Sequence, residues 1–310
     1  MRSCPSCNSG NTKGLYRNLY DKSYFVEGSF SLIQCKSCGL EFLHPKLNEK
    51  ELAKYYPEDE YYSFYDYNSL ALLYHKLSAL YFSKRSKAIN FFLSPFDSLL
   101  YTYFINPGSS VLEIGCGNGM KLEIYKNYGL QTAGLEPYGP QLTEKERFLG
   151  IKRESIDEAN YKENAFDYII LKEVLEHVPD QLNVLKKCYF WLKPRGKLII
   201  TVPDTKSLWR KIFKKSWFGY DVPRHLYNYS RDNIKLILNR SGFQKIKIRN
   251  YDTPYMLDGS LKFYLTKNRK RNKIAEKIIF SNASKLIFTP ISLIASHLNL
   301  GSLMEVECTK

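Results

Sequence analysis

The stretch SVLEIGCGNGMKLEIYKNYGLQTAGLE, residues 110–136, decides the fold. It opens with a strand pattern (110–115), passes through a glycine-rich turn into a helical segment ended by Gly129, and returns to a strand (131–136). Helices are then predicted through about residue 148, over 180–196 and over 230–242. The other predicted strands lie at 151–155, 166–172, 197–203, 244–251 and 303–308. This alternation predicts an α/β protein with a doubly wound, mostly parallel, seven-stranded sheet.

The glycine-rich turn is the place where such a sheet binds a ligand. A triphosphate site would need a Lys-Ser/Thr pair after the last glycine, and that pair is missing. A dinucleotide site would have Gly-x-Gly-x-x-Gly, but here Gly119 comes one residue early. The turn therefore favours a ligand without a phosphate.

Two acidic residues sharpen this interpretation. Glu113 stands two residues before Gly115, where a carboxylate would repel a pyrophosphate. Glu136 ends the second strand, where a carboxylate can accept two hydrogen bonds from a ribose diol. A ligand with a ribose, a cationic group and no phosphate satisfies both residues. S-adenosylmethionine has these properties, and we expect it as the cofactor.

The motifs VLEIGCGNG, GLEP, AFDYIILKEVLEHVPD and LKPRGKLIITVPD resemble, in order and spacing, those of class I S-adenosylmethionine-dependent methyltransferases. The group it resembles includes quinone-biosynthesis O-methyltransferases and enzymes of polysaccharide and deoxysugar pathways. PRHLYNYS (223–230) resembles a stretch in members that carry an N-terminal zinc ribbon. The resemblance covers about residues 108–250 and implies a Rossmann-like fold. The cofactor contacts it implies are Glu113, Gly115, Cys116, Gly117, Asn118, Gly119, Glu136, Pro137, Ser155, Ile156, Lys172 and Glu173.

Two Cys-x-x-Cys pairs stand near the N-terminus, Cys4 with Cys7 and Cys35 with Cys38. Each pair can form a tight knuckle, and four thiolates complete a tetrahedral zinc site. The segment between the pairs can form a hairpin. We therefore expect structural Zn²⁺ in a small ribbon, in a reducing compartment.

Methyl transfer to a hydroxyl or a carbon acid needs a base that removes a proton. His177 and His225 both follow predicted strands at the rim where acceptor and cofactor meet. His225 is expected on the acceptor side, with Arg224 beside it for an anionic group. His177 is either a second base or a hydrogen-bonded scaffold residue.

Aromatic residues gather in the segment before the sheet. Tyr55, Tyr56, Tyr61 and Tyr62 either line a lid over the cofactor, as the resemblance suggests, or form a packing stripe. Tyr61 and Tyr62 are the residues expected to contact the acceptor.

The net charge of +15 is concentrated in the last third of the chain. From residue 203 onward, 21 Lys and Arg residues face 8 Asp and Glu residues, a net charge of +13. Such asymmetry favours an anionic partner or marks a solvated surface. The basic run 267–273 and the apolar stretch 278–300 suggest either peripheral contact with anionic lipid or a helical insertion before a last strand that closes the sheet edge. The N-terminus lacks an apolar signal segment, so we expect a cytoplasmic protein, with an option of contact at the inner membrane face.

Three segments are predicted: a zinc ribbon (1–45), a helical aromatic lid (46–105) and a methyltransferase domain (106–310) with an insertion at about 252–300. The expected function is methyl transfer to a small molecule, a nucleotide- or lipid-linked sugar in polysaccharide or secondary metabolism. The alternative is a ribosomal- or transfer-RNA methyltransferase whose ribbon and basic third bind RNA. A non-enzymatic, membrane-tethered scaffold is a third interpretation.

Overall fold

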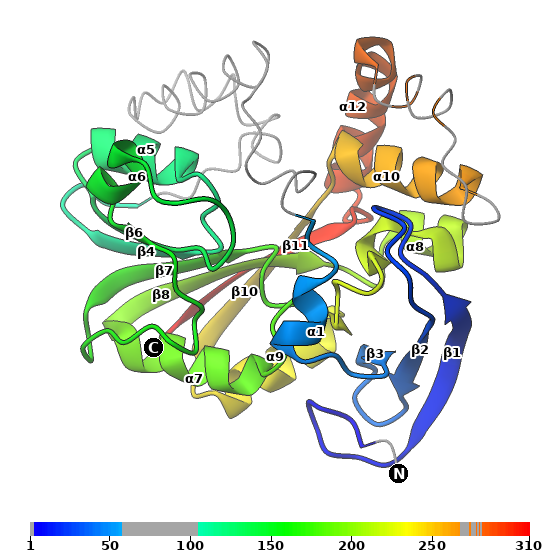
Figure 1. Cartoon of the computed structure of the whole chain (residues 1–310). Helices are drawn as coiled ribbons and strands as arrows, with labels where there is room; N and C mark the ends of the chain where they lie inside the picture. Colours follow the sequence, from blue (N-terminus) through cyan, green and yellow to red (C-terminus); the bar gives the residue numbers. More distant parts are fainter. Residues whose placement is uncertain (1–2, 58–104, 267–272, 274–276, 278, 280) are drawn as a thin grey trace.

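A computed structural model describes residues 3–57, 105–266, 273, 277, 279 and 281–310. Its main feature is a seven-stranded sheet in the order β10-β11-β8-β7-β4-β5-β6 (Figure 1). Strands β4 to β8 run parallel, and β11 pairs antiparallel with both β8 and β10. The strands are β4 (Ser110–Ile114), β5 (Gln131–Leu135), β6 (Ile151–Lys152), β7 (Phe166–Lys172), β8 (Leu192–Pro203), β10 (Gln244–Tyr251) and β11 (Leu303–Thr309). The predicted α/β fold is confirmed.

The sheet is covered on both faces, which explains its nearly continuous apolar strands. Ile169 and Leu171 of β7 belong to one core, which also holds residues of α7 (Gln181–Trp191) and α9 (Arg231–Arg240). Ile170, between them, faces a second core that holds residues of α5 (Met120–Asn127). Helix α6 (Glu144–Phe148) lies on the same side as α5 (Figure 1).

Two predicted element positions need correction. The predicted helix over 180–196 ends at Trp191, and β8 begins at the next residue. Pro194 lacks an N–H and disfavours helical conformation at the residue before it, so the chain becomes extended there. The predicted last strand does not close the sheet edge, because β11 lies between β8 and β10, and β10 is the edge strand.

The N-terminal segment forms a second, four-stranded sheet in the order β1-β2-β3-β9. Strands β1 (Thr12–Leu19) and β2 (Phe30–Cys35) make the predicted hairpin, and β3 (Glu41–His44) follows. The fourth strand, β9 (Tyr227–Asn228), comes from the PRHLYNYS stretch. Strand β9 belongs to the predicted methyltransferase domain but pairs with β3 of the predicted ribbon. The two predicted units therefore share one hydrogen-bonded sheet.

Short helices connect β8 to β9: α8 (Leu208–Phe213), η3 (Lys214–Ser216) and η4 (Phe218–Tyr220). The predicted insertion between β10 and β11 contains α10 (Pro254–Leu265) and α12 (Asn282–His297). Helix α10 packs against both α8 and α12. Within the described residues, no helix combines the length and apolar character needed to cross a membrane.

Candidate active site

A cavity of about 280 Å³ lies at the carboxyl ends of β4, β5 and β7. This is where an open parallel sheet binds its ligand. Helix α1 (Glu49–Ala53) and the chain just after it contribute to one wall. The lining residues are Glu49, Leu52, Tyr56, Ile114, Gly115, Leu135, Glu136, Pro137, Tyr138, Glu154, Ser155, Ile156, Lys172, Glu173, Val174, His177, Val178 and Pro179.

The cavity wall is acidic. It carries four glutamates against one lysine, Lys172. Burial and the nearby Lys121 hold the pKa of Lys172 well below its usual range, and burial raises the pKa of Glu49 and Glu136. An acidic wall of this kind favours a cationic ligand.

The glycine-rich turn brings the backbone to this cavity. Gly115 (φ +71°) and Gly119 (φ +75°) both adopt the left-handed region that favours glycine. A Cβ on Gly115 would lie 2.4 Å from Val174 Cγ2, so a side chain there would force Val174 to move.

Glu113 belongs to β4, before the turn, and Glu136 directly follows β5. Glu136 accepts the backbone N–H of Gly117 at 2.9 Å and that of Tyr138 at 3.2 Å. Burial raises the pKa of both glutamates. Glu113 Oε2 is buried and has no hydrogen-bond partner among the described residues.

Seven of the predicted cofactor residues line the cavity and five do not. The lining residues are Gly115, Glu136, Pro137, Ser155, Ile156, Lys172 and Glu173. The five others, next to or within the turn, are Glu113, Cys116, Gly117, Asn118 and Gly119. The Cys116 side chain packs toward Gly134 of β5, where a Cβ on that glycine would lie 2.7 Å from its sulfur.

His177 is the histidine in the cavity wall. Its Nδ1 lies 2.8 Å from Tyr56 Oη and 3.2 Å from the backbone oxygen of Arg224. The pKa of His177 is held well below its usual range, mainly by burial and secondly by the neighbouring His225. The imidazole is therefore neutral at neutral pH and can accept a proton.

His225 contacts His177 edge to face, with ring centroids 4.6 Å apart, but does not line the cavity. Its Nδ1–H donates to the backbone oxygen of Gly219 at 2.7 Å, which leaves Nε2 as an acceptor. Burial lowers its pKa as well. Of these two histidines, His177 therefore lines the cavity, and His225 packs against the ring of His177.

Glu176 completes a compact group with the two histidines, whose ligand-type atoms all lie within 4.8 Å of one another. Its carboxyl group is fully buried, and neither oxygen has a hydrogen-bond partner among the described residues. Burial raises its pKa well above the usual range. Burial thus disfavours the charged form of Glu176 and of both histidines.

Arg224 has a different place from the one predicted. Its guanidinium is 1% exposed and binds Asp221 and Asp21 as well as the backbone oxygen of Tyr55. The predicted contact with an anionic group of the acceptor is wrong for this geometry, because two buried carboxylates already neutralise the cation.

Tyrosines of the predicted lid divide between two roles. Tyr56 stacks on Tyr138 at 5.0 Å and binds His177, so it belongs to the cavity. Tyr55 packs edge to face on Phe30 and donates to the Glu27 oxygen, which is a packing role. Tyr61 and Tyr62 lie outside the described residues.

Some lining residues carried no sequence signal. Tyr138 follows Glu136 and Pro137 directly and could have been found by its position. Glu49 and Leu52 come from α1, and their distance in sequence from the sheet gave no indication of this contact.

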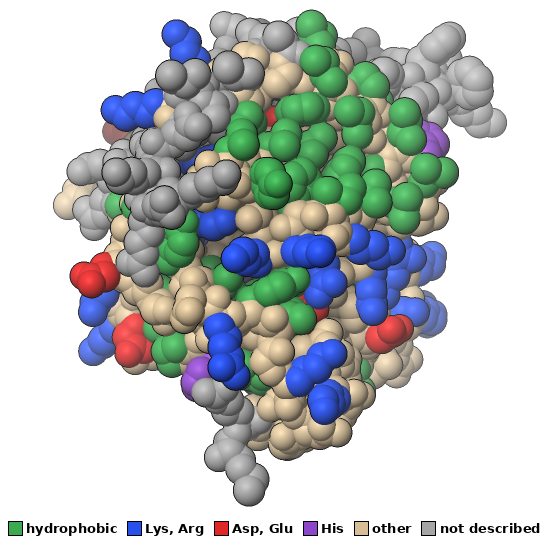
Figure 2. Space-filling view, turned by 90° about the vertical axis from the view of Figure 1, so that its right-hand side faces the viewer, with side chains coloured by type: hydrophobic (Ala, Val, Ile, Leu, Met, Phe, Trp, Pro, Cys, Tyr) green, Lys and Arg blue, Asp and Glu red, His purple; other side chains and the backbone are tan. Residues whose placement is uncertain are grey.

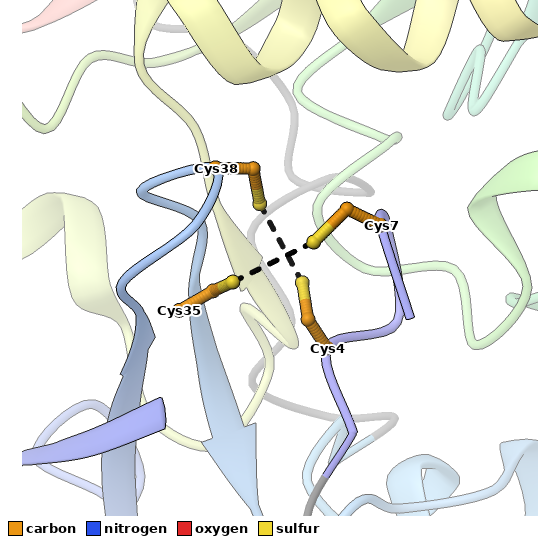
Figure 3. Close-up of side chains that lie close together, drawn as sticks. All are labelled: Cys4, Cys7, Cys35 and Cys38. Carbon is orange, nitrogen blue, oxygen red and sulfur yellow. Dashed lines mark hydrogen bonds between the residues drawn. The ribbon is translucent and has the colours of Figure 1, made fainter. Parts of the chain in front are cut away.

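The four cysteines of the ribbon converge from two knuckles (Figure 3). Cys4 and Cys38 sulfurs lie 3.6 Å apart, as do those of Cys7 and Cys35. Zn–S bonds of about 2.3 Å place tetrahedral sulfurs about 3.8 Å apart. The cluster therefore fits a zinc ion with four thiolate ligands.

A second cavity, of about 350 Å³, lies where the β1–β2 hairpin meets η3, η4 and α10. Arg17, Lys22 and Lys215 line it together with several aromatic rings. Burial, with Lys215 nearby, lowers the pKa of Lys22 to about 8. Lys22 donates to Ser216 Oγ and to the Phe263 oxygen, which anchors it in the wall.

The parallel sheet, the glycine-rich turn and the acidic cavity together define a Rossmann-like protein of the S-adenosylmethionine-dependent methyltransferase class. A family model described as "Methyltransferase domain" matches residues 82–248, over half of the chain, and the chain belongs to this family. The predicted class is confirmed by this match.

Curated relatives match over shorter stretches. A ubiquinone biosynthesis O-methyltransferase of Xanthomonas campestris (strain B100) is 31% identical over 104 residues, covering 31% of this chain and 43% of the relative. One of Burkholderia pseudomallei (strain 1710b) is 26% identical over 157 residues, covering 46% of this chain and 68% of the relative. The chain thus spans less than half the length of the first of these relatives.

Solved structures of methyltransferases are also similar. One is an S-adenosylmethionine-dependent methyltransferase from Archaeoglobus fulgidus, with a TM-score of 0.43 and 20% identity, covering 78% of this chain and 100% of that one. Another is Haemonchus contortus phosphoethanolamine N-methyltransferase 2 in complex with S-adenosyl-L-methionine, with a TM-score of 0.45 and 20% identity, covering 70% and 52%.

Proposed function

We propose that this protein transfers a methyl group from S-adenosylmethionine to a small molecule. The observation that carries the proposal is the acidic cavity beside the glycine-rich turn in a chain of the methyltransferase family. Glu136 would hold the ribose, and Glu113 and the other acidic residues suit the cofactor's ammonium and sulfonium groups. Bound there, the cofactor supplies an electrophilic methyl group.

The chain's own contribution is to position the acceptor and remove its proton. His177 in the cavity wall is the proposed base, because its imidazole is neutral and hydrogen-bonded through Nδ1. With the proton on Nδ1, Nε2 takes the proton of an acceptor hydroxyl. Tyr56 and the Arg224 backbone oxygen hold the ring, and His225 supports it from the side.

For the acceptor we propose a nucleotide- or lipid-linked sugar of polysaccharide or secondary metabolism. The cationic second cavity supports an acceptor with an anionic linker, since Arg17, Lys22 and Lys215 line it. Its wall includes Tyr220 and Asp221, next to the Gly219 oxygen that holds His225.

We further propose that the four cysteines bind structural Zn²⁺ and that residues 1–45 act as a brace. Asp21 binds Arg224, and Ser23 donates to Asp221. Glu41 of the ribbon accepts from both Arg210 and Tyr220. The ribbon is thereby fixed to the segment that carries His225.

The test uses S-adenosylmethionine with a labelled methyl group. The protein is incubated separately with nucleotide sugars, with a lipid-linked sugar extract and with total RNA. Label in either sugar fraction is the expected result. Label in RNA alone would overturn the sugar assignment, and absence of S-adenosylmethionine binding by calorimetry would overturn the whole proposal.

A further inference from the structure

Helix α12 carries a stripe of exposed apolar side chains in addition to Phe288, which packs against the core. Ile287, Ile291 and Ile294 recur at helical spacing, and Leu298 follows just past the helix end. These side chains are exposed, with Ile287 and Ile294 at 61% and Leu298 at 62%. Leu286, on the same side, is 78% exposed. On a surface helix whose outer face contacts only water, these positions would be mostly polar.

The inward face of α12 combines Phe288, which packs against the core, with small residues. Ser284 and Ser292 are buried, as is Ala295. Ser296 Oγ accepts the backbone N–H of Asp252 at 2.8 Å, which anchors the helix to the chain after β10. These contacts therefore fix α12 with its exposed apolar stripe outward.

The apolar surface extends beyond α12. Ile212 of α8 is 54% exposed, and Tyr264 and Leu265 at the end of α10 are also exposed. Figure 2 shows hydrophobic side chains gathered on the upper part of this face. We call the set Ile212, Tyr264, Leu265, Leu286, Ile287, Ile291, Ile294 and Leu298 the apolar face. Exposed apolar side chains gathered on neighbouring helices, as on α8, α10 and α12, mark an interaction site.

Basic residues border the apolar face. Figure 2 shows a row of Lys and Arg side chains below it, and Lys211, Lys214 and Lys215 next to Ile212 are exposed. The sequences of α8, η3 and α12 contain no Asp or Glu, and the one acidic residue of α10, Asp258, is buried. The sequence between α10 and α12 adds five basic residues within 267–273.

We propose that the apolar face docks on the surface of an anionic lipid membrane. The apolar side chains of α12 would enter the boundary between headgroups and acyl chains, and the bordering lysines would meet the lipid phosphates. The contact is peripheral, since α12 is too short to span a bilayer. A second copy of the chain fits the apolar face less well than a membrane does, because pairing two such faces would bring their basic borders together.

The inference does not depend on methyl transfer, but it bears on the acceptor. Tyr264 belongs to the apolar face and Lys215 to its basic border, and both line the second cavity. Docking would therefore present that cavity to the membrane surface, which favours a lipid-linked acceptor over a free nucleotide sugar.

The test is co-sedimentation of the full chain with vesicles of phosphatidylcholine alone or mixed with phosphatidylglycerol. We expect binding to the mixed vesicles that weakens as salt is raised. The double variant Ile287→Asp/Ile294→Asp should bind at least about tenfold more weakly, because two charges enter the interface. The triple variant Lys211→Gln/Lys214→Gln/Lys215→Gln should lose about fivefold per lysine.

The matched control is Phe148→Asp. Phe148 is 69% exposed on α6, which lies far from α12 in Figure 1, and this variant should bind vesicles like the wild type. Circular dichroism and S-adenosylmethionine affinity without vesicles confirm that each variant is folded, and they test the proposed function separately. Equal binding to both vesicle types, or unchanged binding of the double variant, would overturn the inference. A dimer that the double variant converts to a monomer, without vesicle binding, would assign the face to a second copy.

Discussion

His177 is the residue that we propose as the base. Its ring lies in the cavity wall, is neutral and is hydrogen-bonded through Nδ1. We predict that His177→Asn lowers kcat by about 10²–10⁴-fold, the usual contribution of a general base. S-adenosylmethionine affinity, measured by calorimetry, should remain near the wild-type value because the proposed ribose and ammonium contacts involve other residues.

The pH profile supplies the check on this role. Since burial and His225 lower the pKa of His177, the base form persists below pH 6.5, and kcat/KM should decline only below that pH. His297→Asn changes an exposed histidine of α12 and should leave the profile unchanged. A decline centred above pH 7, or wild-type turnover by His177→Asn, would move the base to another group.

Gly115 gives a second residue-level prediction. Alanine there would adopt a strained φ and place its Cβ 2.4 Å from Val174 Cγ2. We expect Gly115→Ala to weaken S-adenosylmethionine binding by at least about tenfold, because a shift of the turn displaces groups that line the cavity. Gly129→Ala is the matched control, since Gly129 has a similar φ of +85° but nothing within 4 Å of the added Cβ.

Two variants distinguish backbone strain at positive φ from the steric clash with Val174 as the cause of weaker binding. If Gly129→Ala weakens binding as much, backbone strain in general is responsible. If Gly115→Ala/Val174→Ala restores affinity, the collision with Val174 is the cause.

For single residues, the sequence patterns correctly placed the glycine-rich turn and Glu136 at the cavity. They wrongly assigned Arg224 to an anionic group of the acceptor. The turn is a local feature, so spacing alone places it. Arg224 is neutralised in part by Asp21, 203 residues away in the chain. No local pattern reports such a long-range ion pair, and an arginine beside a candidate catalytic histidine looked like an acceptor contact.

Among the elements, the cysteine ribbon is the one whose removal can be tested most directly. Its residues bind Arg210, Tyr220, Asp221 and Arg224. We predict that Cys38→Ser loses bound zinc, frees the segment around residues 216–225 and lowers turnover by more than about tenfold, because structural zinc contributes folding energy outright. Zinc content by mass spectrometry and hydrogen exchange over 216–225 measure these effects.

The control for the ribbon is Cys308→Ala. Cys308 is fully buried in β11, away from the cluster, and its loss should leave the zinc content unchanged. Wild-type hydrogen exchange over 216–225 in zinc-free Cys38→Ser would show that the brace does not depend on the metal.

Element existence was predictable here and element boundaries were less so. Strong periodicity marked α7 and α9, and the structure adds a capping box of Ser230 with Asn233 at the start of α9. The end of α7 depends on Pro194, three residues further on, and the position of β11 depends on pairing with β8 and β10. Pairing between distant strands is a tertiary choice that hydrophobic pattern does not encode.

For the whole molecule, the central question is how the ribbon and the large sheet form one structure. The sequence suggested separate segments, because both cysteine pairs lie before residue 45 and the strand–helix alternation begins only after residue 105. Instead, β9 completes the ribbon's sheet, and a buried group of Asp21, Arg224 and Asp221 joins the two parts. The contact with Arg224 lowers the pKa of Asp221 despite its burial, so Asp221 remains ionised and stabilises the fold until the pH falls below its usual range.

Arg224→Met tests this ionic group. The variant leaves Asp21 and Asp221 buried without their cation, so we expect the free energy of unfolding in urea to fall by about 3–5 kcal/mol. Adding Asp21→Asn and Asp221→Asn should recover part of the loss, because the unpaired charges are removed with it. Glu123→Gln, at an exposed ion pair with Lys145, is the matched control and should cost less than about 1 kcal/mol. If Arg224→Met is as stable as the wild type but raises KM for the acceptor, the cation serves the substrate, and the two parts are held together by β9 and the ribbon's other contacts.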